Sequence, residues 1–395
     1  MSDHAARDEA QQSDAPKRRG KVKKRHTVGK VLLASAIVLG LVTGLGVAYL
    51  YRHLNGNLNV IDVTDQLTNR PEKQVEGPQE PLNVLVMGSD DRDAPGNNID
   101  NLTGGAARSD TTILFHLSAD RERAYGISIP RDSLVNRPTC KSRDGETIAG
   151  GTDVMWNEAF ALGGPGCTIQ QFEQITGVFV DHYVVVDFAG FEDMVDAIDG
   201  VPVCIPEDIE DPSHGINIPA GTREVEGREA LNYVRARYTL GDGSDIGRIK
   251  RQQAFIAAMA AKVISGGTLA RLDRLIGFLD AATKSLTVDK GLDKIDKIAR
   301  MGRGFQNIGL DNIQFITVPW EYDQRPEYAG RVSWLPQQSN ELWDKIAADE
   351  PLTRRLTDEA ISAAKPSGSG SGNGNPSGNP SPSEVDDAEA NGLCA

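Results

Sequence analysis

Hydrophobic and charged positions separate sharply at the start of the chain. A basic block occupies positions 17–25, and the run 31–51 contains no charged residue. An uncharged apolar run of about 20 residues has the length of a helix that crosses the bilayer core. It is longer than the core of a typical signal peptide and no clear small-residue cleavage site follows, so we predict an uncleaved transmembrane helix over 31–51. Residues 1–30 then form a cytoplasmic basic tail, and everything after the helix lies outside the cytoplasm as a single-pass membrane protein.

Beyond this helix the pattern changes from polar to globular. Residues 52–80 hold few apolar positions and are expected to form a stalk, whereas strand-like and helix-like runs alternate over 81–350. Such alternation predicts a single extracytoplasmic α/β domain, layered, with a mixed central sheet flanked by helices. Positions 351–395 are expected to be a low-complexity tail, since 366–382 are mostly Ser, Gly, Asn and Pro. Strands are expected at 83–87, 111–117, 123–129, 182–186, 201–205 and 313–318, and helices at 157–162, 168–176, 188–198, 249–264 and 269–286.

Four cysteines lie in the part of the chain that is expected to be outside the cytoplasm. An even number fits disulfide bonds there, although four cysteines allow three pairings. Cys140 and Cys167 bracket the segment 141–166, which looks irregular apart from one short helix and has little apolar material of its own, so we expect these two to be bonded. Cys204 and Cys394 remain as the other pair. No CxxC motif or His/Cys cluster occurs, which argues against a zinc site.

The net charge of -14 is unevenly distributed. Residues 1–30 carry a balance of +5, which leaves -19 for the remaining positions. Non-specific nucleic-acid binding depends on a broad basic surface that neutralises phosphates, so nucleic acid is not an expected partner. Arginines that gather within such an acidic body therefore indicate a binding site.

Several of these arginines lie at 233–253. Arg235 and Arg237 are two residues apart, so an extended segment would point both guanidinium groups to the same side. Positions 241–244 are typical of a turn, and Asp245 is a good N-cap for the helix that follows. Asp245 could equally belong to the binding site itself.

One face of that helix is expected to carry polar groups at one end and apolar groups at the other. Arg248, Gln252, Phe255 and Met259 are spaced by four, three and four residues. Arg248 falls in the first helical turn, where the helix dipole disfavours a cation unless an anion shares the site. A solvated basic loop before an ordinary amphipathic helix would explain Lys250, which is off this face, but not the shared face itself. We interpret the face as a phosphate-binding cluster beside an apolar cavity.

Loops at the ends of three expected strands carry similar side chains. Ligand sites in α/β sheets gather where strands end, so these loops are expected to converge with the arginine segment. A carboxylate pair can hold a hydrated magnesium ion that substrate phosphates bridge, and arginine forks recognise phosphate oxygens. The combination suits a diphosphate ester, whereas each loop taken singly would fit a local salt bridge or cap. The residues are Asp90, Arg92, Arg108, Ser109, Asp110, Arg131 and Asp132.

Six short motifs follow one another in order within positions 81–265. They are GSDDR (88–92), RSDT (108–111), SIPRDS (128–133), NEAFALGG (157–164), HYVVVDFAGF (182–191) and YVRARYTLGDGSDIGRIKRQQ (233–253). With these motifs the chain resembles the LytR-CpsA-Psr family, membrane-anchored transferases that attach glycopolymers to bacterial peptidoglycan. The last motif is hard to obtain by chance.

The resemblance implies a polyprenyl-pyrophosphate-linked glycan as substrate, with its lipid tail in a hydrophobic cavity and its pyrophosphate held by arginines and Mg²⁺. It implies a phosphotransferase that moves a glycopolymer from this carrier to peptidoglycan, with membrane lipid and the peptidoglycan acceptor as further partners. Carried over motif by motif, it implies metal ligation by Asp90 and Asp110, catalytic roles for Asp110, Arg108 and Arg131, and substrate binding by Arg92, Arg235, Arg237, Asp245, Arg248 and Gln252.

Two positions depart from the family pattern, and two other functions compete with transfer. Met155 stands where many members carry lysine, and the nearest basic residue after the PRD motif is Arg137. One alternative is a phosphatase that hydrolyses polyprenyl pyrophosphate, with water in place of the sugar acceptor. The other is a non-catalytic wall-binding or lipid-binding regulatory protein. The presence of both aspartates together with all the arginines favours catalysis, since binding alone could dispense with one metal carboxylate.

Overall fold

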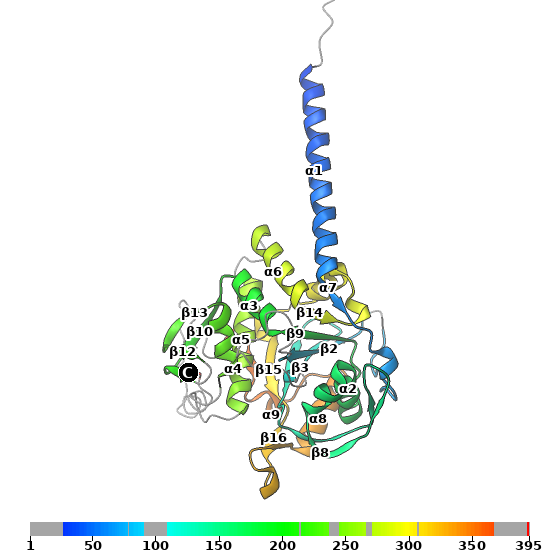
Figure 1. Cartoon of the computed structure of the whole chain (residues 1–395), viewed down its shortest axis with the longest axis vertical. Coiled ribbons are helices and arrows are strands. Elements are labelled where there is room, and N and C mark those ends of the chain that lie inside the picture. The colour runs from blue at the N-terminus through cyan, green and yellow to red at the C-terminus, as the bar shows by residue number, and fades with distance from the viewer. Residues whose placement is uncertain are drawn as a thin grey trace, which may run out of the picture. The chain divides into compact units, whose positions relative to one another are not determined.

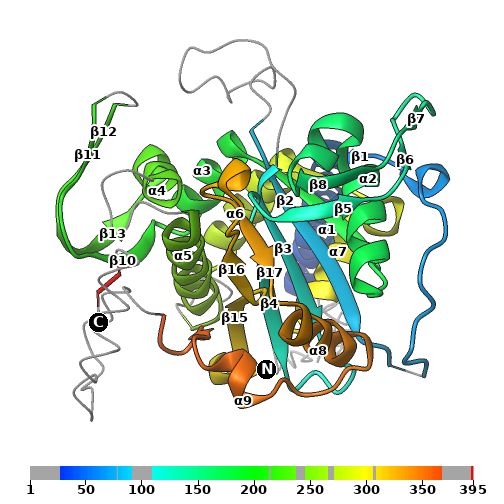
Figure 2. The ribbon, with the colours of Figure 1, turned by 90° about the horizontal axis from the view of Figure 1, so that it is seen from below.

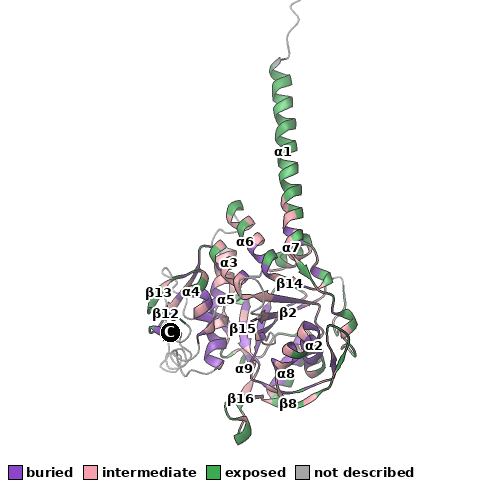
Figure 3. Ribbon diagram, viewed as in Figure 1, coloured by how far each residue is buried: buried purple, intermediate pink, exposed green. Residues whose placement is uncertain are grey.

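The computed structural model describes residues 27–77, 79–90, 109–212, 215–236, 245–265, 271–305, 308–366 and 393–394. The chain divides into two compact units, residues 1–50 and 51–395. Among the described residues, α1 (Thr27–Asn57) is the one helix that is long and apolar enough to cross a membrane. Its side chains are exposed along most of its length (Figure 3). The helix agrees with the membrane-spanning segment that the uncharged run predicts.

A mixed eight-stranded sheet organises the second unit (Figure 1). Its strand order is β1-β14-β9-β2-β3-β4-β15-β18. β2 pairs in parallel with β9, β4 pairs in parallel with β15, and β3 runs antiparallel between β2 and β4, which confirms the expected mixed sheet. The strands are β1 (Asn59–Val60), β2 (Leu82–Ser89), β3 (Ser109–Leu117), β4 (Ala124–Ile129), β9 (His182–Asp187), β14 (Leu286–Val288), β15 (Ile313–Thr317) and β18 (Ile361–Ser362).

Helices cover both faces of this sheet (Figure 2). On one face, Leu85 and Met87 of β2 share an apolar cluster with α2 (Glu158–Thr176) and α8 (Pro336–Ala347). The intervening residues Val84 and Val86 belong to a cluster on the other face, because successive side chains of a strand point to opposite sides. The remaining helices are α3 (Phe188–Ala197), α4 (Gly227–Arg235), α5 (Asp245–Ser265), α6 (Leu272–Ser285), α7 (Ile295–Arg303) and α9 (Arg354–Thr357).

The two helices expected at 157–162 and 168–176 are continuous in the structure. They join into α2 across a kink at Gly164, whose φ of 63° and ψ of -152° lie outside the helical region. Pro165 follows immediately, and proline lacks the N–H that a regular helix would need at this position. The expected interruption is therefore present as a kink and not as a loop.

Beside the main sheet, a second apolar cluster lies under α5. It is built by β10 (Val201–Ile205) and β13 (Gly221–Val225), which pair antiparallel, together with residues of α3, α4 and α5. Short strands β11 (Ile209–Asp211) and β12 (Ile216–Ile218) add Ile209 and Ile218 to it. We call this group the α5 apolar cluster.

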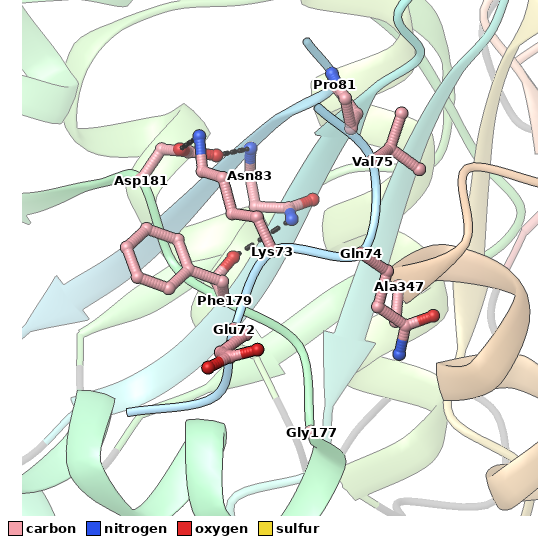
Figure 4. Close-up of a pocket in the computed structure, with 10 residues that line it drawn as sticks. All are labelled: Glu72, Lys73, Gln74, Val75, Pro81, Asn83, Gly177, Phe179, Asp181 and Ala347. Atoms are coloured by element: carbon pink, nitrogen blue, oxygen red, sulfur yellow. Dashed lines mark hydrogen bonds and ion pairs between the residues drawn. The ribbon is translucent and has the colours of Figure 1, made fainter. Parts of the chain in front are cut away.

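The expected stalk over 52–80 differs from the structure. β1 extends the main sheet by pairing with β14, and Val63 is buried in the cluster beneath α2. Arg70 forms an ion pair with the buried Glu173, and Lys73 forms one with Glu80. Figure 4 shows Lys73 beside Asp181, with which it forms a second ion pair. Apart from the burial of Val63, these contacts come from backbone pairing and charged side chains, which a scarcity of apolar residues does not reveal.

The expected tail over 351–395 also begins too early. Leu356 and Ile361 are buried, and β18 pairs antiparallel with β15 at one edge of the sheet. Further on, Leu393 is buried and Cys394 is bonded to Cys204 of β10. Residues 367–392, which include most of the low-complexity stretch, lie outside the described residues.

The segment between the first two cysteines is more ordered than expected. It forms two antiparallel pairs, β5 (Leu134–Arg137) with β8 (Gly151–Met155) and β6 (Cys140–Lys141) with β7 (Thr147–Ile148). The disulfide Cys140–Cys167 ties the inner pair to α2, as predicted, and both cysteines are buried. The apolar group at this point is small, since Cys140, Ala159, Cys167 and Ile148 make up the whole of it.

We therefore expect the Cys140→Ala/Cys167→Ala double variant to lose roughly 3 kcal/mol of unfolding free energy. The bond closes a loop with a sequence separation of 27, and loops of this size stabilise by about that amount in the chain-entropy model. Urea unfolding of the detergent-solubilised protein measures the loss. Ser142→Ala, in the same segment, is the control, and equal stability of the double variant and this control would contradict the prediction.

Candidate active site

The carboxyl ends of four strands lie at one edge of the main sheet. β2, β9, β4 and β15 run parallel to one another, and β3 begins at that same edge because it is antiparallel to both β2 and β4. Asp90 directly follows β2, Asp110 is the second residue of β3, and Arg131 lies two residues after β4. The topology thus brings three of the predicted loops together, as expected for α/β sheets.

A bulge in the β2–β3 pairing gives Asp110 a special position. Gly88 pairs with Thr111 and Ser89 pairs with Ser109, so Asp110 is the extra residue on its strand. β-bulges bend the strand and redirect a side chain, and they are common beside active sites. The bulge explains why a carboxylate near the start of a sheet strand can turn toward the arginines at the edge.

Asp110, Arg131, Asp245 and Arg248 form a compact group that we call the arginine–aspartate cluster. Arg131 Nη1 donates to Asp110 Oδ1 at 2.6 Å, and Arg131 Nε lies 3.2 Å from Asp245 Oδ1. Arg248 Nη2 lies 2.6 Å from the same Asp245 oxygen and 3.2 Å from the main-chain oxygen of Asp110. Residues from β3, the loop after β4 and α5 therefore share one network of ion pairs.

The charged state of Arg131 is secured by its surroundings. Burial disfavours the guanidinium cation, but the carboxylates of Asp110, Asp245 and Asp132 outweigh this, so the pKa of Arg131 lies above its ordinary value. The Arg248 side chain is more deeply buried, only 3% exposed. Both cations are thus held in a partly dry environment, where their interaction with an anion is stronger than in water.

Asp245 belongs to this network of ion pairs and is also the first residue of α5. α5 begins at Asp245, and its carboxylate faces Arg131 and Arg248. A negative charge in the first helical turn is favoured by the helix dipole. The Asp245 carboxylate is also the anion that offsets the unfavourable interaction between the Arg248 cation and the helix dipole in the first turn of α5.

The rest of the predicted α5 face lies as expected. Thr111 Oγ1 donates to Gln252 Oε1 at 3.3 Å, and Gln252 Nε2 donates to the main-chain oxygen of Val234 at 3.1 Å. Phe255 is fully buried in the α5 apolar cluster, and Met259 packs against it. One helix face therefore runs from the arginine–aspartate cluster to a large apolar group.

A buried hydroxyl lies within the α5 apolar cluster. The ring of Tyr233 is 6.3 Å from that of Phe255, and among the described residues its hydroxyl has no hydrogen-bond partner. Burial raises the pKa of Tyr233 to about 12, so the group stays neutral.

The structure corrects the prediction for Arg235, and three other predicted site residues fall in segments that it does not describe. Arg235 is the last residue of the helix α4, not part of an extended segment, and its guanidinium lies over the ring of Phe188 at 4.8 Å. The predicted side-by-side projection of two arginines therefore does not apply to it. Arg92, Arg108 and Arg237 lie outside the described residues.

A further arginine reaches this edge from a distant part of the chain. Arg331 Nη1 donates to Asp132 Oδ1 at 2.6 Å, while Arg131 Nε lies 3.7 Å from the other oxygen of Asp132. Arg331 precedes β17 (Val332–Trp334), which pairs with β16 (Trp320–Tyr322) in a hairpin. By contrast, Arg137 contacts Glu158 and the main-chain oxygen of Ala149. Arg331, not Arg137, is the additional basic residue beside the PRD motif, and no motif in the sequence pointed to it.

The carboxylates at this edge suit a hydrated divalent cation. Asp90 and Asp110 come from the same ends of neighbouring strands, and carboxylate oxygens are ligands that Mg²⁺ prefers. In the described part of the chain no group of three or more His, Cys, Asp or Glu side chains could hold a metal alone. Two carboxylates fit an ion that takes its remaining oxygens from water and from a phosphorylated ligand.

The fold and the site define an α/β protein with one helix long and apolar enough to cross a membrane and a cluster of arginines and aspartates at the carboxyl edge of its sheet. The LytR_cpsA_psr family model matches residues 50–345, and the chain belongs to this LytR-CpsA-Psr family.

Several curated relatives support this membership. The chain is 32% identical over 260 residues to the cell wall biosynthesis protein LcpA of Corynebacterium glutamicum, a match that covers 60% of this chain and 49% of the relative. It is 37% identical over 225 residues to the probable cell wall biosynthesis protein LcpB of the same organism, covering 55% and 50%. TagV of Bacillus subtilis, named a polyisoprenyl-teichoic acid–peptidoglycan teichoic acid transferase, is 29% identical over 64% of this chain and 62% of its own. The chain thus spans about half to three fifths of these relatives.

Solved structures show the same fold. A LytR-Csp2A-Psr enzyme from Actinomyces oris matches with a TM-score of 0.54 and 22% identity, over 74% of this chain and 96% of its own. TagT bound to LI-WTA matches with a TM-score of 0.54 and 24% identity, over 73% and 98%. A family structure with bound octaprenyl pyrophosphate lipid has a TM-score of 0.50 and 22% identity, over 73% and 98%.

Proposed function

We propose that this protein is a membrane-anchored phosphotransferase that moves a glycopolymer from a polyprenyl-pyrophosphate carrier to peptidoglycan. The observation that carries the proposal is the arginine–aspartate cluster at the start of α5, whose face continues into the α5 apolar cluster. A ligand with a charged diphosphate and an apolar tail has the same two-part character. The teichoic acid transferase name of one relative and the pyrophosphate lipid in one neighbour support the same substrate class.

Binding of the diphosphate is expected to add a further partner to the arginines of the cluster. Arg131 and Arg248 now pair with Asp110 and Asp245. Guanidinium groups recognise phosphate oxygens with parallel hydrogen bonds, so each arginine can turn a second edge to the ligand without losing its carboxylate. Gln252 lies one turn beyond Arg248 on the same face of α5, and its side-chain amide is a further group that can contact the diphosphate. The cations are already oriented before substrate arrives, which favours electrostatic stabilisation of developing charge.

The proposed reaction is a displacement at phosphorus. An acceptor sugar hydroxyl attacks the phosphorus nearer the glycan and forms a new P–O bond. The bond from that phosphorus to the bridging oxygen breaks, and polyprenyl monophosphate leaves with the electron pair. Arg131 and Arg248 stabilise the charge on the leaving phosphate, and the hydroxyl proton passes to a carboxylate, for which Asp110 and Asp90 are candidates.

We further propose that Asp90 and Asp110 hold Mg²⁺ with the substrate diphosphate. When bound, this ion supplies positive charge that offsets the phosphate oxygens. Asp110 would then both help to hold the ion and accept the hydrogen bond from Arg131.

Arg331→Ala is expected to lower turnover about tenfold. Arg331 holds one oxygen of Asp132, and without it Asp132 competes more strongly for Arg131, which the substrate needs. The Arg331–Asp132 ion pair is partly exposed. We therefore expect its loss to cost as much free energy as one of the weaker hydrogen bonds to a charged group, which corresponds to the tenfold change in rate. Steady-state transfer assays measure it, with Arg300→Ala on α7 as an exposed, ion-paired control. Unchanged turnover would show that the hairpin arginine has no part in the site.

The orientation in the membrane is also proposed. Because the basic block precedes α1, residues beyond this helix are expected outside the cytoplasm. Protease added to intact, wall-stripped cells should digest the large unit and leave a short fragment that an N-terminal tag detects. Complete protection of the large unit would reverse the orientation.

Native mass spectrometry of the detergent-extracted chain tests the proposed carrier. We expect a polyprenyl phosphate or a pyrophosphate-linked glycan to remain bound to the wild type and to be lost from Arg131→Ala/Arg248→Ala. A folded wild-type protein that retains no such lipid, even when purified carrier is added, would contradict the proposed substrate.

A further inference from the structure

A separate polar pocket lies along the same edge of the sheet, beyond β15. It has a volume of about 230 Å³. Its wall includes Trp320 of β16, Gln338 of α8 and Lys250 of α5, together with side chains from the segment 355–359. Elements from four parts of the chain thus enclose one space that neither the arginine–aspartate cluster nor the α5 apolar cluster occupies.

The polar groups of this pocket are balanced in charge. Lys250 and Arg355 face Asp358 and Glu359 around the same space. Lys250 is buried, and its Nζ donates to both the carboxylate and the main-chain oxygen of Glu359, each at 3.0 Å. An anion such as a second diphosphate would meet two carboxylates here, so the pocket favours a neutral ligand with many hydrogen-bonding groups.

An aromatic ring and an amide complete the lining. Trp320 contributes an indole ring, and the side-chain amide of Gln338 offers both a donor and an acceptor. Sugars present apolar C–H faces and hydroxyl edges, which match an aromatic surface flanked by planar polar groups. The volume lies below the roughly 300–1,000 Å³ of sites for drug-sized ligands, as a site for one sugar ring would.

Packing contacts connect the wall of the pocket to the segments that carry the arginine–aspartate cluster. Trp320 packs with Ile246 and Ile249 from the first turns of α5, and with Val332. Val332 forms an isolated β-bridge with Ser133, two residues after Arg131. Both the start of α5, which carries Asp245 and Arg248, and the loop that carries Arg131 therefore contact the wall of the pocket.

The separation between the two sites is short. Thr317, in the pocket wall, pairs with Ser128 of β4, and Gln253 donates to the hydroxyls of both. Ser128 precedes Arg131 by three residues, which is about 10 Å of extended chain. A short oligosaccharide spans such a distance, so a sugar held in the pocket can present a neighbouring hydroxyl to the diphosphate.

We propose that this pocket binds a sugar of the acceptor glycan strand of peptidoglycan. The inference rests on the proposed transfer function and names the place where the acceptor is held. It assigns stacking on the sugar ring to Trp320 and hydrogen bonding to its hydroxyls to Gln338. Lys250 and Glu359 fix the opposite wall through their mutual contacts.

The test uses the full chain in detergent and peptidoglycan glycan oligomers without stem peptides. Saturation-transfer NMR first measures oligomer binding in the absence of donor. We expect Gln338→Ala and Trp320→Ala each to weaken binding about tenfold, the size of a lost aromatic or hydrogen-bonded contact. Gln337→Ala is the matched control, because Gln337 is the exposed neighbour on α8 and does not line the pocket.

Kinetics then separate acceptor binding from chemistry. In the transfer assay, Gln338→Ala is expected to raise the acceptor KM about tenfold, with the donor KM and kcat at saturating acceptor unchanged. Equal oligomer binding by Gln338→Ala, Trp320→Ala and Gln337→Ala would overturn the pocket assignment, as would binding of stem peptides in place of glycan. Glycan binding that depends on Gln338, in a wild-type protein that transfers nothing, would uphold the pocket and overturn the proposed transfer function.

Discussion

Arg131→Ala and Arg248→Ala are each expected to reduce transfer turnover by about 10²–10³ while the protein remains folded. A donor that is preoriented toward developing charge commonly contributes this much to the rate. Arg131 also neutralises the carboxylates of Asp110 and Asp245, so its removal leaves negative charge facing an anionic substrate. Arg248 is the more buried of the two and shares Asp245 with Arg131.

Conservative variants sharpen this expectation. Arg131→Lys keeps the charge but loses the planar fork, so its turnover should fall between those of the wild type and Arg131→Ala. Steady-state transfer with a short lipid-pyrophosphate-linked glycan gives the rates, and thermal unfolding checks the fold. Arg300→Ala, at an exposed ion pair on α7, should retain wild-type turnover. Near-normal activity in the Arg131→Ala/Arg248→Ala double variant would remove the arginine–aspartate cluster from the mechanism.

Asp110→Asn is expected to change the magnesium dependence as well as the rate. If Asp110 and Asp90 share the ion with the substrate, loss of one carboxylate should raise the Mg²⁺ concentration for half-maximal activity at least about tenfold. Changes to groups that only orient metal ligands already cost about 10–100-fold in metal affinity. The turnover should also fall, because the Asp110 carboxylate accepts a hydrogen bond from Arg131.

The shift in magnesium midpoint separates these two roles of Asp110. Loss of the Arg131 contact alone would lower turnover without moving the midpoint, whereas loss of a metal ligand moves both. Magnesium titrations of the wild type and Asp110→Asn make the comparison, and Asp311→Asn at an exposed turn is the control. An unchanged midpoint in Asp110→Asn would refute the proposed metal role of this residue.

The main sheet and the face of α5 were predictable because burial imposes a period on the sequence. Apolar runs marked β2 and β4, and the spacing of Arg248, Gln252 and Phe255 marked a helix face that the structure buries. The α4 helix was not predicted, because the spacing of Arg235 and Arg237 also fits an extended segment. Its buried Tyr233 and Val234 in fact lie on a helical turn that ends at Arg235.

Other features left no such trace in the sequence. Residues 59–73 join the domain through β1 and through the ion pairs of Arg70 and Lys73, and ion pairs between distant positions leave no periodic pattern in the sequence. Arg331 meets Asp132 across 199 positions and belongs to no motif, so only the folded hairpin places it. The role of Asp245 also depended on the fold, since a cap and an ion pair demand the same residue type.

The fate of the phosphorus atom nearer the glycan distinguishes phosphoryl transfer from hydrolysis and from binding alone. A donor labelled at the phosphorus nearer the glycan is incubated with the full chain, Mg²⁺ and a peptidoglycan oligomer. We expect the label to move to the oligomer together with the glycan, and one unlabelled polyprenyl monophosphate to be released for each product. Label that stays on the lipid, or that appears as free glycan phosphate equally with and without the oligomer, would contradict this expectation.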